Sequence, residues 1–177
     1  MTQPLFALTS VAATVLITAC STMAEMKAPV VPAAIAVPAG NKVALTSVGI
    51  GDLTYECRVK ASAAGAFEWA FVGPVAVLYD AKKAPIGKYY AGPTWESNDG
   101  SKVTGKQLAV SPNPGAIPLQ LVQANPATGA GAMTGVTYIQ RLNTVGGTAP
   151  TDACGADNLA AKKTVKYQAD YIFYKTM

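Results

Sequence analysis

Apolar and polar residues alternate with a period of two along most of the chain, in short runs that turn residues separate. The clearest run places Leu53, Tyr55, Cys57 and Val59 on one face and polar or charged residues on the other. The last run, residues 164–174, alternates in the same way. This pattern predicts half-buried β-strands, with Cys57 pointing into the core.

Strand-like runs follow one another from residue 42 to residue 174, divided by clusters of Gly, Pro, Asn and Asp. We predict an all-β fold, an antiparallel β-sandwich or barrel-like domain of about nine or ten short strands. At most one short helix is expected, at residues 157–163. The candidate strands are 42–48, 53–60, 67–71, 75–79, 88–91, 94–96, 101–110, 118–124, 135–144 and 164–174.

An apolar run at residues 5–19 ends at Cys20 and is shorter than the roughly 20 residues that span a membrane. It is typical of a secretory signal peptide. Residues 17–20, Ile-Thr-Ala-Cys, resemble the lipobox of bacterial lipoproteins, whose cysteine receives diacylglycerol. We expect residues 1–20 to be the signal peptide and Cys20 to be lipidated. Cleavage nearby, which gives a soluble secreted protein, is the alternative.

A lipid on Cys20 would make the membrane the first partner of the protein. It would place the chain in the bacterial cell envelope, on the periplasmic side or surface of the outer membrane. Residues 21–40 are rich in Ala, Val and Pro, a composition that disfavours helices and central strands. We expect an extended tether there, followed by a single β domain at residues 41–177.

Charge and histidine content exclude several classes of protein. The net charge of +4 comes from 14 basic and 10 acidic residues, and the basic residues are scattered. We therefore expect no nucleic-acid partner. The chain has no histidine, which removes the usual base of serine and cysteine nucleophiles and the usual ligand of catalytic zinc. We expect no metal and no cofactor.

The chain has three cysteines, and an even number is left for pairing once Cys20 is assigned to the lipid or removed with the leader. Cys57 and Cys154 then remain, and an oxidising compartment favours a disulfide between them. Two unpaired buried thiols are the alternative.

Aromatic and acidic residues gather around a strand break in the middle of the chain. Gly92 and Pro93 interrupt the run that starts before them and bend the backbone. Trp95 and Glu96 are thereby expected near a bend, where Trp95 is either core or a platform on which a ligand stacks.

Arg141 is one of only two arginines and lies in a polar strand. It is expected either to pair with a carboxylate such as Glu68, Glu96 or Asp170, or to recognise an anion. If the domain binds a ligand, the candidate binding residues are Tyr89, Tyr90, Trp95, Glu96 and Arg141.

A series of short motifs in fixed order covers the region from about residue 37 to residue 174. The chain resembles the domain-of-unknown-function family 3455, a set of secreted proteins of bacteria and fungi. The resemblance implies an extracytoplasmic β domain and assigns neither an activity nor catalytic residues. The motifs that carry it are VPAGNK (37–42), YECR (55–58), EWAF (68–71), YYAGPTWE (89–96), QRLNTVGG (140–147), Cys154 and ADYIFY (169–174).

Three functions are compatible with the sequence. The first is a non-catalytic envelope module that binds a glycan or an envelope partner through the aromatic and acidic cluster. The second is a glycoside hydrolase that uses two carboxylates among Glu68, Glu96 and Asp99, since such chemistry needs no histidine. The third is a structural or assembly role in the envelope.

Overall fold

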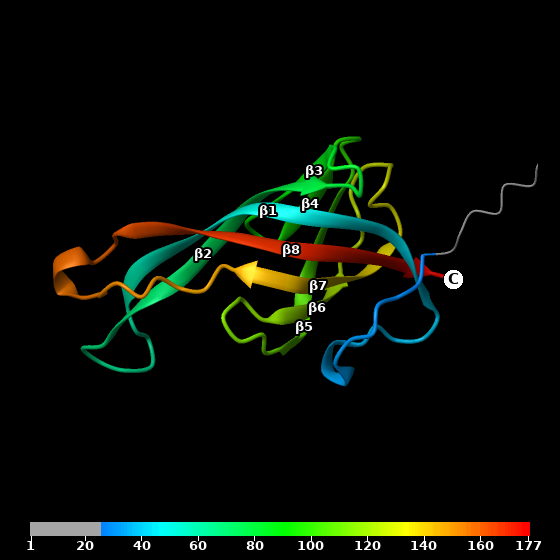
Figure 1. Ribbon diagram of the computed structural model, residues 1–177. Helices are drawn as coiled ribbons and strands as arrows, with labels where there is room; N and C mark the ends of the chain where they lie inside the picture. Colours follow the sequence, from blue (N-terminus) through cyan, green and yellow to red (C-terminus); the bar gives the residue numbers. More distant parts are fainter. Residues whose placement is uncertain (1–25) are drawn as a thin grey trace, which may run out of the picture.

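The computed structural model describes residues 26–177 and shows eight antiparallel strands closed into one barrel (Figure 1). Each strand pairs with the next along the chain, and β1 closes the barrel against β8. The predicted all-β antiparallel class is confirmed, in its barrel-like form. The strands are β1 (Asn41–Val59), β2 (Phe67–Tyr79), β3 (Pro85–Tyr90), β4 (Thr94–Ser97), β5 (Lys102–Ser111), β6 (Leu119–Ala124), β7 (Val136–Gly146) and β8 (Lys162–Thr176).

The strands are fewer and longer than the sequence predicted. β1, β2 and β8 have 19, 13 and 15 residues. β1 unites two of the predicted runs, because Gly49 and Gly51 stay in the ladder with β2. β2 unites two more predicted runs across Gly73 and Pro74, next to a β-bulge at Val72, which has no partner in β1 between Thr54 and Tyr55. Bulges are among the few places where a strand tolerates proline.

Inward-facing aromatic rings fill the middle of the barrel. Trp95 of β4 stacks on Tyr89 of β3, with 4.7 Å between ring centroids. The Trp95 ring also makes edge contacts with Tyr171 and Phe173 of β8, at 5.7 and 6.4 Å. Gly49 gives the Tyr171 ring its room, because a Cβ at that position would lie 2.6 Å from the ring. Such edge and offset contacts add to the stability gained by burying the rings.

One end of the barrel continues into an arm, formed by residues 56–71 and 148–164 (Figure 1). A disulfide between Cys57 and Cys154 ties β1 to the loop before β8 and closes 97 residues of chain. The predicted bridge is confirmed. The Trp69 indole fastens the same loop by donating to the backbone oxygen of Asp152 at 2.9 Å. The helix expected at 157–163 is only a single 3-10 turn, η2 (Ala156–Asn158), because the chain enters β8 at Lys162.

The last part of the segment that precedes the barrel is folded against the barrel. We predicted an extended tether at 21–40, and residues 21–25 lie outside the described part of the chain. A 3-10 turn, η1 (Ala33–Ile35), instead buries Ile35 completely against Leu121 and Leu142 on the outer wall. Gln140 donates to the Ile35 carbonyl at 2.6 Å. Other apolar side chains of this Pro-rich segment pack on the same part of the wall, which its composition did not indicate; they are Val31 and Val37.

Within residues 26–177, no helix is long and apolar enough to cross a membrane.

Candidate functional site

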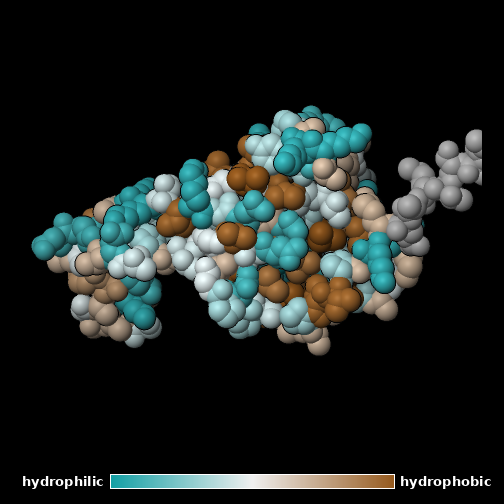
Figure 2. Space-filling view, viewed as in Figure 1, coloured by the Kyte–Doolittle hydropathy of each residue, from teal (hydrophilic) through white to brown (hydrophobic). Residues whose placement is uncertain are grey.

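A pocket of about 400 Å³ enters the barrel at the end that carries the arm. It opens between Phe71 and Val72 of β2 and Pro118, which precedes β6. The space-filling view shows the surface hollowed between the arm and the barrel body (Figure 2). The pocket thus continues from the molecular surface to the aromatic core.

The pocket walls are mostly apolar, with a few polar side chains at defined positions. Besides the tyrosine hydroxyls, three polar side chains line it, those of Gln107, Gln120 and Arg141, and no carboxylate of the described residues does. Aliphatic side chains and prolines supply most of the rest. Small-molecule sites have this composition, in which apolar walls provide affinity and a few polar groups fix orientation. Five aromatic rings contribute to the walls, those of Tyr55, Phe71, Tyr89, Tyr167 and Tyr171.

Arg141 reaches the pocket because of its place in β7. Successive residues of a strand point to opposite faces, so Ile139 and Arg141 face inward while Gln140 and Leu142 pack outside under η1. The Arg141 guanidinium donates from Nε and Nη2 to the Pro118 carbonyl, at 3.1 and 2.8 Å. These bonds hold the charge at the pocket wall.

No carboxylate of the described residues pairs with Arg141, which corrects the pairing we had expected. Glu68 lies 4.0 Å from Lys60 on the arm, and Asp170 accepts a hydrogen bond from Asn143 at 2.7 Å. Glu96 has its own lysine partners on the outer wall. Of the two predicted roles for Arg141, the carboxylate pairing is therefore absent.

The tyrosine hydroxyls of the pocket stay protonated at neutral pH. Burial raises the pKa of Tyr171 well above its ordinary value, and burial also raises the pKa of Tyr89 and of Tyr55. The positive charge of Arg141 opposes each of these increases, because it favours a tyrosinate nearby. The Tyr55 hydroxyl donates to the Gly147 carbonyl at 2.7 Å, and that of Tyr167 lies 3.2 Å from that of Tyr171. Neutral hydroxyls of this kind can donate to a ligand oxygen.

The structure divides the five predicted site residues between two faces of the barrel. Tyr89 and Arg141 line the pocket, whereas Tyr90 and Glu96 lie on the outer wall. Trp95 is only 1% exposed and does not line the pocket. Of the two roles left open for Trp95, the structure shows the core one, because Gly92 adopts φ 90° in a tight turn and the ladder resumes at once. Trp95 therefore points into the core as the direct partner of Tyr89.

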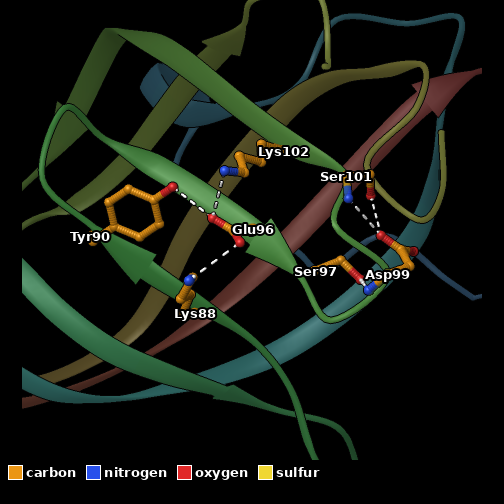
Figure 3. Close-up of polar contacts among 7 residues, drawn as sticks. All are labelled: Lys88, Tyr90, Glu96, Ser97, Asp99, Ser101 and Lys102. Atoms are coloured by element: carbon orange, nitrogen blue, oxygen red, sulfur yellow. Dashed lines mark hydrogen bonds and ion pairs between the residues drawn. The ribbon is translucent and has the colours of Figure 1, made fainter. Parts of the chain in front are cut away.

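Glu96 is held by three partners on the outside of β3, β4 and β5 (Figure 3). The Tyr90 hydroxyl donates to it at 2.7 Å, and Lys88 and Lys102 lie 3.3 and 3.2 Å away. The Tyr90 hydrogen bond is the main cause that lowers the pKa of Glu96, and the lysines add to it. This ladder of cross-strand partners is a structural arrangement.

Asp99 lies in the turn that joins β4 and β5, and it connects this turn to the loop before β7 (Figure 3). Its carboxylate accepts from the Ser101 hydroxyl at 2.6 Å and from the amide of Ala132 at 2.7 Å. Hydrogen bonds from Ser101 and Ala132 lower the pKa of Asp99 to about 2. The lowered pKa values of Asp99 and Glu96 favour their ionised forms, whereas a general acid needs a raised pKa.

Sequence reasoning missed most of the pocket. Gln107 and Gln120 look like ordinary surface residues in the sequence, and Tyr55, Tyr167 and Tyr171 look like ordinary core residues. A signal was present in β6 and β7, where Gln120 alternates with Pro118 and Val122 and Arg141 follows Ile139 on the same face. Only the pairing of Gln120 with Arg141 across the two strands brings them to one place.

These features define a class, an up-and-down β-barrel of eight strands with a pocket of small-molecule size at one end. The chain belongs to the family described as "Protein of unknown function (DUF3455)", which matches residues 38–175. The family resemblance noted in the sequence is confirmed. No curated protein and no solved structure matched the chain.

Proposed function

We propose that this protein is a non-catalytic binding module that holds a small amphipathic molecule in the barrel pocket. The observation that carries the proposal is the pocket itself, about 400 Å³ in volume and lined mainly by aromatic and aliphatic side chains. Ligand sites have volumes of roughly 300 to 1,000 Å³. Eight-stranded barrels are also wide enough to hold one small ligand.

The pocket replaces the surface cluster as the binding site. The cluster at Tyr90, Trp95 and Glu96 was expected to bind a glycan or an envelope partner, and enclosure of Trp95 removes its aromatic platform. Tyr89 and Arg141, the other members of that prediction, belong to the pocket. A hydrolase is less favoured, because Glu68, Glu96 and Asp99 each have other partners and none lines the pocket.

A neutral fluorescent probe tests the pocket directly. N-phenyl-1-naphthylamine is apolar and uncharged, and its emission rises when it leaves water for an apolar site. We expect saturable binding to the folded protein. Gln120→Phe should weaken it at least about tenfold, equivalent to about 1.4 kcal/mol, because the larger side chain projects into the pocket.

Gln123→Phe is the matched control for this measurement. Gln123 lies on the same strand and is exposed, and it does not line the pocket. It should bind the probe as the unchanged protein does. Equal loss in both variants, or no saturable binding to the unchanged protein, would refute the proposed function.

We further propose that the module works at the bacterial cell envelope, anchored by a lipid on Cys20. The support is the lipobox-like sequence at residues 17–20, which lies outside the described residues. A Cys57–Cys154 disulfide suits an oxidising compartment. Mass spectrometry of the mature protein should find an acylated N-terminus at Cys20. A free, unacylated terminus at Glu25, or a retained Met1, would contradict the anchor.

A further inference from the structure

We infer that the ligand of the barrel pocket is an amphipathic carboxylate whose head group binds Arg141. The inference rests on the proposed function, because it names the chemical class of the molecule that the pocket holds. It assigns Arg141 as the residue that selects an anion and the aromatic walls as the surface that holds the apolar body.

The charge of Arg141 has no counter-ion among the described residues that line the pocket. Arg141 is the only charged side chain among the pocket-lining residues, and its bonds go to the neutral carbonyl of Pro118. A charge that is partly withdrawn from water is costly unless it is paired. The bonds to Pro118 use Nε and Nη2, which leaves the Nη1 group free to donate. An anion in the pocket would supply the missing partner.

A carboxylate fits the donors around Arg141. The guanidinium is planar and matches the oxygens of a carboxylate in geometry and charge. The Tyr89 hydroxyl has no hydrogen-bond partner among the described residues, and the Arg141 charge acts on it closely enough to oppose the rise in its pKa. Gln120, directly opposite Arg141 in the ladder, adds an amide. These groups can hold a head group of a few oxygen atoms.

The rest of the pocket favours an apolar body. The mouth is lined by Phe71 and Val72, which are 51% and 40% exposed, and by Pro74, Pro93 and Pro118. When a ligand's apolar surface covers exposed apolar side chains beside a cavity, the free energy of the complex is lowered. The ligand is therefore a carboxylate with an alkyl or aromatic tail rather than a small polar acid.

The test compares molecules that share a tail and differ in the head group. Decanoate, decan-1-ol and decyltrimethylammonium carry a negative, a neutral and a positive head, and each displaces N-phenyl-1-naphthylamine if it enters the pocket. For the unchanged protein near pH 7.5, we expect decanoate to bind at least about tenfold more tightly than decan-1-ol. The cationic compound should bind most weakly.

Variants of the two arginines test whether the preference for decanoate over decan-1-ol arises in the pocket. Arg141→Gln should bring the ratio of decanoate to decan-1-ol affinity close to one, and Arg141→Lys should keep part of it. Arg58→Gln is the matched control, because Arg58 pairs with Glu56 on the arm and lies outside the pocket. It removes the same net charge and should leave the ratio unchanged.

Gln120→Glu tests the same inference without removing Arg141, in case Arg141→Gln does not fold. A carboxylate opposite Arg141 would pair with it and should also bring the ratio close to one. The inference is overturned if the ratio of decanoate to decan-1-ol affinity is near one in the unchanged protein. It is also overturned if the high ratio of the unchanged protein persists in both Arg141→Gln and Gln120→Glu. In either case the proposed pocket stands. If neither the probe nor decan-1-ol binds the unchanged protein, the proposed function itself fails.

Discussion

Replacing Cys57 and Cys154 by alanine should lower the free energy of unfolding by about 2–5 kcal/mol, the range typical of native bridges in small secreted domains. The bridge closes 97 residues of chain, so its loss releases a large loop in the unfolded state. It also frees the β7–β8 loop from β1. Urea denaturation followed by circular dichroism measures the change.

Reduction of the unchanged protein provides the control for this experiment. A reducing agent should lower its stability to that of the double alanine variant and should not affect the variant. Quantitative alkylation of Cys57 and Cys154 in the unfolded, unreduced protein would show that the bridge is absent.

Trp95→Ala should destabilise the barrel by about 3–5 kcal/mol, because it leaves a large cavity among closely packed rings. Trp95 is almost fully buried and contacts Tyr89, Tyr171 and Phe173. Equilibrium denaturation by urea gives the difference between variant and unchanged protein.

Trp69→Ala is the matched comparison for this effect. Trp69 is half-buried on the arm, where its indole donates to Asp152 and a lysine lies over its ring. Less apolar surface is withdrawn from water there, so its loss should cost clearly less. A Trp95→Ala variant that keeps full stability but loses ligand binding would restore the platform, the other role that the sequence left open for Trp95.

The sequence predicted the fold class because alternation with a period of two is a local property. Residues 53–60 and 164–174 alternate clearly, and all of them except Lys60 lie in strands of the barrel. The number of strands was overestimated because glycine and proline were taken as breaks. At Gly49 and Gly73, pairing with neighbouring strands is maintained, and this pairing is a tertiary property.

The candidate site could be predicted only in part. The disulfide followed from the number of cysteines and the expected compartment. Two of the candidate binding residues, Tyr89 and Arg141, line the pocket, but they were grouped with Tyr90 and Glu96, which point the other way. The direction of each side chain depends on where the Gly92 turn ends. A shift of one residue in the register of the strand moves each of its side chains to the opposite face of the sheet.

On the proposed function, the inside of the barrel, and not its outer wall, binds a small amphipathic molecule. The most direct measurement is a titration of ¹⁵N-labelled protein with decan-1-ol, followed by the amide resonances in two-dimensional NMR. We predict saturable shifts for pocket residues such as Tyr89, Val122 and Arg141. Shifts that instead centre on Lys88, Glu96 and Lys102 of the outer wall, or no shifts at all, would contradict the claim.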